Sequence, residues 1–509
     1  MFIQTETEMA QDKKRSLKLN IIASMAIQVL SLLTNLISKR AINYYLNVEY
    51  LGIQSIYSNF CDVLSFVFIG MGTAVLFHFY GPLARNDEKK IKAVYTYFDK
   101  IYRNISWVVL AGGFLSTFSV LFLVDADITV WEISVTYIVF MLSVVFYNRQ
   151  LLRFYFIQAD QRRYIVATVY GVVDFLALAV QVLLLHLFHS YLPFVICLLV
   201  KNLIINLIFK LYIKKNYSYI FDKNAEEGSL QPKEKKQIHS DVTDMAMFRF
   251  GNVLINNTDS IYISYFISTA VVGIFSNYQF VVMGIRSIVG ALYEALRGKI
   301  GFNMQTTDKK EQFKEFNIHS LVNAWMVGVC ICCFYYLIQD FIGIWMGKVE
   351  RLPQYIVWVL IVNFYLEESR NATKVYRESA GLFQNIKKII LLKGFLNIIL
   401  SFILGLYYGL MGILVATSIS AAVTLFWYEP VIVYRYFKKS IWNEVLYNLY
   451  SVALTAVAFL LTGLAISPIQ GSSIFMFFIK ALVCFVTSNI IYLLLFAILR
   501  KTKGTKNGH

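Results

Sequence analysis

Long apolar runs dominate this chain and limit the folds that it can adopt. Of its 509 residues, 58% are hydrophobic and only 15% are charged. A run of about 20 apolar residues is long enough to cross a hydrocarbon core of roughly 30 Å as a helix. The pattern predicts an all-α polytopic membrane protein with fourteen spans, near residues 19–38, 52–80, 105–124, 131–148, 164–188, 191–213, 242–267, 272–296, 321–345, 353–369, 386–405, 409–430, 444–466 and 473–499.

The positions of the charges predict the orientation of the spans. The net charge is +16, with 47 basic and 31 acidic residues. Nearly all of the basic residues outside the spans fall in alternate connections, starting with the N-terminal tail. The opposite connections carry only Lys39, Arg40, Lys348 and Arg351. This positive-inside asymmetry predicts that both termini are cytoplasmic, and it favours contact with membrane lipids over nucleic-acid binding.

Polar stripes within two of the spans reveal an internal repeat. Residues 28–57 align without a gap with residues 249–278, at an offset of 221, and share eight identities, which include Asn35 with Asn256 and Gly52 with Gly273. Both stripes have spacings of three, four and three residues, which place their members on one helix face. Lipid cannot satisfy such a face, so it should line a bundle interior or a water-filled cavity. The stripes are Gln28, Ser31, Asn35 and Ser38, and Arg249, Asn252, Asn256 and Asp259.

The repeat and the loops predict the domain organisation. Six spans return the chain to the cytoplasmic side, so the seventh enters the membrane in the same direction as the first, as in a parallel repeat. We expect a six-helix lobe over residues 1–213, a polar linker over 214–240, a second six-helix lobe over 241–431, and an appended helix pair with a tail over 432–509. All six prolines fall in loops or at the ends of spans, which predicts largely continuous helices.

The segment from Tyr50 to Arg103 carries a family resemblance. It reads LGIQSIYSN, then GMG at residues 70–72, then YGPLARNDEKKIKAVYTYFDKIYR. This resembles the bacterial polysaccharide and O-antigen flippases, the polysaccharide transporter branch of the multidrug/oligosaccharidyl-lipid/polysaccharide exporter superfamily. The number of spans and the two lobes extend the likeness over nearly the whole chain.

The resemblance implies a function in the cytoplasmic membrane of a bacterium. It implies that a polyprenyl-phosphate- or diphosphate-linked oligosaccharide crosses to the outer leaflet by alternating access, for capsule, exopolysaccharide or O-antigen assembly. Polysaccharide polymerase and glycosyltransferases are implied as partners in the same way. The motif does not indicate which sugar is carried or which ion couples transport.

Arg249 and Arg286 are the sharpest site candidates in the sequence. An arginine at the centre of a membrane helix costs about 3 kcal/mol on insertion scales, so it needs a polar partner. A guanidinium can bind two phosphate oxygens, so both residues could hold the lipid phosphate while Asn252 and Asn256 contact the glycan. The alternative is structural pairing within the membrane: of Arg249 with Asp244 or Asp259, and of Arg286 with Glu294.

The first stripe is predicted to complete the substrate site with uncharged groups. The repeat matches Gln28 to Arg249 and Ser65 to Arg286, so neutral positions in the first lobe correspond to cations in the second. We therefore expect the second lobe to hold the anionic head and the first lobe to supply hydrogen bonds. Lys39 and Arg40 end the first stripe on the outer side, either as an exit site for the phosphate or reaching towards the outer headgroups.

Carboxylates within the spans are candidates for coupling to an ion or proton gradient. Asp62, Asp259 and Glu294 are the residues proposed for this role. A structural role is equally open for Asp62, in a polar cluster with Asn59 and Ser65.

Catalytic and metal-binding motifs are missing from the sequence. It contains no Walker-type phosphate loop, no His-Glu-x-x-His and no Gly-x-Ser-x-Gly, so we expect neither an enzyme nor a cofactor. The six cysteines lie in apolar spans without metal-ligand spacing, which indicates packing. The rival function is a proton- or sodium-coupled multidrug or cation antiporter of the same superfamily. A scaffold for assembly enzymes explains the polar stripes poorly.

Overall fold

The computed structural model describes residues 29–222, 230–347, 350–382, 386–469, 471 and 473–506, and it is all-α over these residues. They form two compact units, Met1–Gly273 and Ile274–His509. Ten helices are long and apolar enough to cross a membrane. This confirms the predicted all-α polytopic membrane fold. The predicted lobe boundaries stay a prediction.

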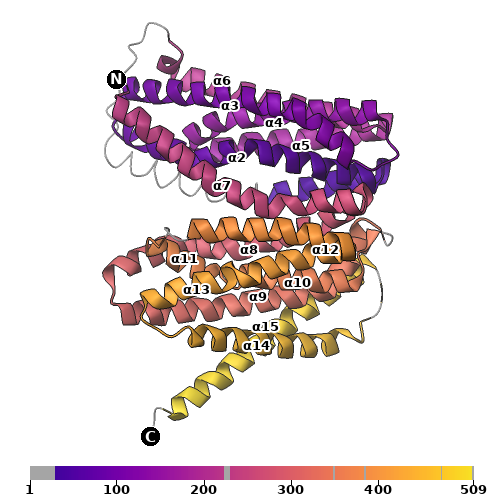
Figure 1. Cartoon of the computed structure of the whole chain (residues 1–509), viewed down its shortest axis with the longest axis vertical. Helices are drawn as coiled ribbons and strands as arrows, with labels where there is room; N and C mark the ends of the chain where they lie inside the picture. Colours follow the sequence, from indigo (N-terminus) through magenta and orange to yellow (C-terminus); the bar gives the residue numbers. More distant parts are fainter. Residues whose placement is uncertain are drawn as a thin grey trace. The chain divides into compact units, whose positions relative to one another are not determined.

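The first unit consists of long helices that pack side by side (Figure 1). A helix covers residues 29–45 of the described chain. It is followed by α2 (Val48–Ala84), α3 (Glu88–Leu123), α4 (Val130–Ala159), α5 (Arg163–Phe188), α6 (Tyr191–Asn216), the 3₁₀ turn η1 (Ser218–Ile220) and α7 (Pro232–Phe266). α7 packs along α2, and α4 packs against α2, α3 and α6.

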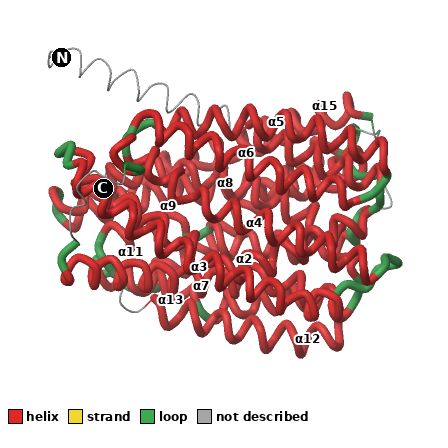
Figure 2. The backbone as a smooth tube through the Cα atoms, turned by 90° about the horizontal axis from the view of Figure 1, so that it is seen from above, coloured by secondary structure: helices red, strands yellow, loops and turns green. Residues whose placement is uncertain are grey.

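The second unit repeats this plan and adds two helices. Its elements are α8 (Thr269–Thr306), α9 (Lys309–Trp345), α10 (Gln354–Glu368), α11 (Asn371–Ser379), α12 (Ile386–Val423), α13 (Leu425–Tyr436), α14 (Trp442–Ile466) and α15 (Ile474–Lys506). The first residues of α8 belong to the first unit. Figure 2 shows helices joined by short loops throughout.

Within the described residues the predicted spans correspond to helices, with two local differences. Gly409 has a non-helical φ of 55° inside α12, so α12 contains two helical segments that meet close to the loop predicted between two spans, in agreement with the sequence. Thr424 separates α13 from α12, whereas one span was predicted there. The short helix α11 lies in a segment that was predicted to be a loop. The prediction was made because the charged residues of this segment exclude a membrane span.

Helix boundaries follow the 221-residue offset well beyond the region of sequence identity. α2 begins at residue 48 and α8 at 269, and α3 begins at 88 and α9 at 309. The caps are shared as well: Asp87 accepts a hydrogen bond from Lys90 N at 3.0 Å, and Asp308 accepts one from Glu311 N at 2.8 Å. The α5–α6 turn at residues 189–190 corresponds to the break near Gly409.

Two glycines related by the repeat permit a close helix crossing in the first unit. A Cβ on Gly52 of α2 would lie 2.0 Å from the carbonyl oxygen of Thr269, and a Cβ on Gly273 of α8 would lie 2.2 Å from the carbonyl oxygen of Val48. Val48 and Thr269 are the first residues of their helices. The contact is therefore reciprocal, and any side chain at either glycine would push the backbones apart.

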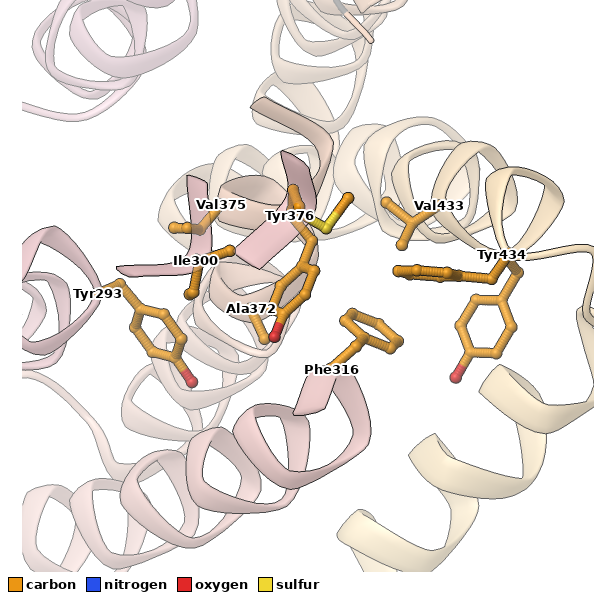
Figure 3. Packing of buried hydrophobic residues seen from close by; sticks show 10 residues of the cluster. Tyr293, Ile300, Phe316, Ala372, Val375, Tyr376, Val433 and Tyr434 are labelled. Atoms are coloured by element: carbon orange, nitrogen blue, oxygen red, sulfur yellow. The ribbon is translucent and has the colours of Figure 1, made fainter. Parts of the chain in front are cut away.

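An aromatic core anchors one end of the second unit. It joins α8, α9, α11 and α13 (Figure 3), and its members are Tyr293, Ile300, Met304, Phe316, Ala372, Val375, Tyr376, Val433, Tyr434 and Phe437. Phe316 is fully buried, and its ring packs edge-on against Tyr376 and Tyr434. This packing fixes α11 and α13, which carry the charged residues described below.

Candidate functional site

The first polar stripe is partly exposed in the structure. Ser31 and Asn35 are exposed, and the Asn35 amide donates to Ser31 O at 2.8 Å. Lys39 is half-buried and Arg40 is exposed. Gln28 lies outside the described residues. These positions therefore stay predicted substrate contacts, and Asn35 has an amide oxygen on an exposed face.

Arg249 lies on α7 beside helices of the first unit. Its guanidinium lies within electrostatic range of the Tyr155 hydroxyl of α4. Its Nε atom is buried and has no hydrogen-bond partner among the described residues. No ion pair joins Arg249 to a carboxylate in the described part of the chain, and the side chain of Asp244, one of its two predicted alternative partners, lies outside that part. Asn252 and Asn256 share α7, but their side chains lie outside the described residues.

The GMG motif shapes the surroundings of Arg249. A Cβ on Gly72 of α2 would lie 2.2 Å from Cζ of Tyr155, so only glycine leaves room for this ring. A Cβ on Gly70 would lie 2.8 Å from Met245 O of α7. The two glycines therefore let α2 approach both α4 and α7. This explains why a motif quoted for its resemblance lies next to a predicted site residue.

Ionic contacts hold the start of α7 to the first unit. His78 Nε2 of α2 lies 3.0 Å from Asp241 Oδ2, and Lys90 Nζ of α3 lies 2.6 Å from the Glu234 carboxylate. Asp241 and Glu234 precede the predicted seventh span, so both contacts lie towards the end of the unit that is predicted to be cytoplasmic. His78 therefore contacts protein, and a purely lipid-facing position is excluded.

Arg286 of α8 has a different partner from the one considered in the sequence analysis. Its Nε lies 3.4 Å from Oε1 of Glu368, without the geometry of a directional hydrogen bond. Glu294 instead is mostly exposed and pairs with Arg297 at 3.1 Å, three residues along the helix. Glu368 is nearly fully buried, so it offsets the charge of Arg286 locally.

A buried charge cluster surrounds Glu368 in the second unit. Arg370 contacts both Glu367, at 2.8 Å, and Glu429 of α13. Arg377 of α11 also contacts Glu429, at 3.4 Å. Among these, Arg370, Arg377 and Glu429 are at least 96% buried. Lys374 and Lys393 both contact Glu367. We call the set of Glu367, Arg370, Lys374, Arg377, Lys393 and Glu429 the α10–α13 charge cluster.

This cluster was not predicted from the sequence. Glu367 and Glu368 fall at the end of the predicted span 353–369, and the residues from Arg370 on fall in the cytoplasmic connection that follows, where charges are expected to be solvated. One signal was available: at 221 residues before Arg370 and Lys374, the sequence has Arg149 and Arg153, so the cations repeat at equivalent positions. That regularity favours an ordered helix over a solvated loop.

The remaining predicted carboxylates differ in their surroundings. Asp62 is exposed on α2, while Asp259 of α7 is 7% exposed. Both make further interactions. Besides Lys393, two lysines within spans have carboxylate partners: Lys201 pairs with Asp174 at 3.0 Å, and Lys480 pairs with Asp340 at 2.8 Å. Lys480 therefore joins α15 to α9.

Comparison with solved structures shows what fold this arrangement belongs to. A chain described as the lipid II flippase MurJ in an inward closed conformation superposes with a TM-score of 0.66 at 14% identity, over 94% of this chain and 99% of that one. An inward-facing multidrug resistance MATE family transporter of the MOP superfamily gives 0.61 at 11% identity, over 81% and 96%. The chain has the fold of MOP-superfamily transporters.

Other comparisons add detail to this fold assignment. A MOP superfamily transporter from Pyrococcus furiosus, described as having a binding pocket of reverse polarity, gives a TM-score of 0.53 at 12% identity, over 84% and 97%. No protein-family model and no curated protein matches the sequence. At these identities the likeness establishes the MOP fold, and the substrate has to be argued from the residues.

Proposed function

We propose that this protein is a flippase that moves a polyprenyl-phosphate- or diphosphate-linked oligosaccharide across a bacterial cytoplasmic membrane by alternating access. The observation that carries the proposal is the extent of the structural match. The lipid II flippase covers 94% of this chain with a TM-score of 0.66, whereas the multidrug transporter of comparable likeness covers 81%. The resemblance of residues 50–103 to polysaccharide flippases supports the same substrate class.

The charges within the membrane helices are consistent with an anionic lipid head. In this proposal Arg249 binds the phosphate directly, because no carboxylate pairs with it in the described part of the chain. Arg286 contributes while paired with Glu368, an arrangement that lowers its net attraction for an anion. Asn252, Asn256, Gln28, Ser31 and Asn35 supply hydrogen bonds to the glycan, and Lys39 and Arg40 receive the phosphate on the outer side.

The setting of the protein follows from the same proposal. Both termini lie in the cytoplasm, the two six-helix lobes are joined by the linker at 214–240, and the pair α14 and α15 is appended to the second lobe. The partners are membrane lipids, the lipid-linked oligosaccharide, and the polymerase and glycosyltransferases that act before and after it. Capsule, exopolysaccharide or O-antigen assembly is the process served.

A second function is supported by a separate observation. Asp62 is an exposed carboxylate on the apolar helix α2, which suits a proton- or sodium-coupled antiporter with cationic ligands. Asp259 and Glu294 would share the coupling role in that case. MATE proteins of the same fold are described as multidrug transporters.

A binding measurement separates the two functions. The purified protein is titrated with a polyprenyl-diphosphate that carries a short glycan, and in parallel with a cationic dye. Arg249→Gln is combined with the pair Arg286→Gln and Glu368→Gln, because removing Arg286 alone would leave a buried carboxylate unpaired. The flippase proposal predicts that wild type binds the lipid-linked glycan and that the triple variant does not.

The control for this experiment is Glu368→Gln alone. It removes the same carboxylate but keeps both arginines, so we expect lipid binding at least as strong as in wild type. Binding of the dye without binding of the lipid would move the assignment to the antiporter. Equal lipid binding by wild type and a correctly folded triple variant would exclude the two arginines as the phosphate site.

A further inference from the structure

Arg153 of α4 is a buried cation, 9% exposed, with no carboxylate partner among the described residues. It donates a hydrogen bond to the amide oxygen of Asn206 in α6, and its Nε has no partner in that part of the chain. The buried hydroxyl of Tyr95 in α3 lies beside the Arg153 guanidinium and makes no further hydrogen bond with described residues. These groups leave hydrogen-bonding capacity for an anion.

The charges around this position do not cancel. Arg153, Arg149 and Asp99 all lie within electrostatic range of the Tyr95 hydroxyl. Asp99 pairs with Arg149 at 3.4 Å, which leaves the three groups with a net charge of +1. The side chains of Arg149 and Asp99 are 24% and 32% exposed, so this pair is partly solvated, whereas Arg153 is buried.

The repeat shows that the imbalance is particular to the first unit. At the offset of 221 residues, Arg149 corresponds to Arg370, and Arg153 corresponds to Lys374. In the second unit Glu367 lies 2.8 Å from Arg370 and 3.1 Å from Lys374. The position equivalent to Glu367 in the first unit is Phe146. In the first unit Arg149 keeps Asp99 as a partner, whereas Arg153 has no carboxylate partner among the described residues.

One more substitution across the repeat points the same way. Glu429, which contacts Arg370, corresponds to Ile208. An uncompensated charge is costly in a protein interior, so an arginine retained without a carboxylate is suited to an anion from outside the chain.

The depth of Arg153 indicates which anion it meets. The predicted fourth span ends at residue 148 on the cytoplasmic side, and α4 continues to Ala159. At 1.5 Å per residue, Arg153 lies about 7 Å beyond the end of that span, at the level of the inner headgroups. Phosphate esters are the anions concentrated there. A guanidinium binds their oxygens in pairs and stays charged at any relevant pH.

We propose that Arg153, Asn206 and Tyr95 form a binding site for the phosphate group of a lipid in the inner leaflet, within the first unit and separate from Arg249 and Arg286. This deepens the flippase proposal and rests on it for the identity of the lipid, a polyprenyl phosphate. The site receives the phosphate on the cytoplasmic side. The α10–α13 charge cluster has no such role, because its cations are already paired with carboxylates of the same cluster.

The decisive variant is Asn206→Asp. It places a carboxylate of nearly the same shape against Arg153, and so reproduces in the first unit the internal neutralisation of the second. The expected result is a higher melting temperature without ligand, together with a loss of undecaprenyl phosphate affinity of about 10- to 100-fold, as for one or two charge-assisted hydrogen bonds. Binding is measured by tryptophan fluorescence in detergent micelles.

A matched control makes the same change elsewhere on α6. Asn216→Asp adds the same charge near the end of the helix, where Asn216 donates only to Tyr212 O and is exposed. Its affinity should stay within about twofold of wild type. Tyr95→Phe removes one hydroxyl with little change of shape and should weaken binding about threefold. The Tyr95→Phe variant can be used to test the site by the same binding measurement if Asn206→Asp does not fold.

Three ligands distinguish the failure of the site from the failure of the proposed function. Undecaprenyl phosphate, undecaprenol and inorganic phosphate are compared on wild type and Asn206→Asp. Equal binding of undecaprenyl phosphate by both proteins would refute the site and leave the flippase proposal intact. Binding of inorganic phosphate that Asn206→Asp abolishes, without binding of the polyprenyl lipid, would keep the site and refute the carrier.

Discussion

The α10–α13 charge cluster makes a strong prediction about stability, because Glu429 is nearly fully buried between two arginines. The change Glu429→Gln keeps the shape of the side chain and removes its charge. Arg370 retains Glu367 at 2.8 Å and Arg377 retains Glu378 at 3.3 Å, so neither arginine loses its last partner. Breaking a buried ion pair typically costs 3–5 kcal/mol, and the remaining partners place the expected loss at the lower end, about 3 kcal/mol.

The assay for Glu429→Gln is reversible unfolding of the purified protein in dodecyl maltoside with increasing sodium dodecyl sulfate, followed by tryptophan fluorescence. The free energy of unfolding is compared with that of Glu378→Gln, a control in the same cluster. Glu378 is partly exposed, so its change should cost less than about 1 kcal/mol. A double variant with Arg370→Gln should show a coupling of about 0.5–3 kcal/mol.

A particular result would refute this reasoning. If Glu429→Gln lowers the free energy of unfolding by no more than Glu378→Gln does, the two carboxylates act alike. Burial would then not be what makes Glu429 important. A double variant whose loss equals the sum of the two single losses would likewise show that Arg370 and Glu429 do not interact energetically.

Two further predictions concern the first unit. Gly52→Ala should destabilise the fold by at least about 1 kcal/mol, because the added Cβ would lie 2.0 Å from the Thr269 carbonyl oxygen; a thermal melt unchanged from wild type would contradict the close crossing. Hydrogen bonds from Lys90 and from the backbone N–H of Gln231 lower the pKa of Glu234 below its ordinary value. Its stabilisation is therefore present above about pH 4.5 and lost as the pH falls through the lowered pKa, and it amounts to less than about 1 kcal/mol because the pair is exposed. Glu234→Gln should make the melting temperature less dependent on pH as the pH falls below about 4.5.

Much of the fold could be predicted from the sequence because the membrane restricts the choice. A lipid-exposed segment must satisfy its backbone internally, so an apolar run of sufficient length is a helix. The prediction of two spans around Gly409 succeeded for this reason. The helix α11 and the helix break at Thr424 were not predicted. Their local sequence lacks the simple apolar pattern of a span, and contacts with other helices determine their conformation.

The candidate site was harder to predict, because partners in the membrane come from helices that are distant in sequence. Glu294 shares α8 with Arg286 and was the natural candidate on spacing alone. The structure instead places Glu368, 82 residues away along the chain, beside the arginine. Nothing in the local sequence of α8 indicates this. The stripe residues Ser31 and Asn35 stay predictions of substrate contact, which the exposure of their side chains permits.

The repeat separates what the backbone requires from what the two units do differently. Features that fix helix geometry recur at the same offset: the caps Asp87 and Asp308, and the close approach of Gly52 to the first turn of α8. Steric requirements and backbone hydrogen bonding determine such features, and these requirements are the same in both units. The carboxylates Glu367 and Glu429 do not recur, although Arg370 and Lys374 have Arg149 and Arg153 at the equivalent positions.

This difference changes where an anion should be sought. Counting only Arg249 and Arg286 would make the second lobe the cationic one. Counting carboxylates as well changes the balance locally, because Arg286 has Glu368 beside it, while the described hydrogen-bond acceptor of Arg153 is the amide oxygen of Asn206. An internal carboxylate competes with any incoming phosphate for the same guanidinium. A ligand phosphate therefore gains most at an arginine that has no carboxylate beside it among the described residues, which favours Arg153 over Arg286.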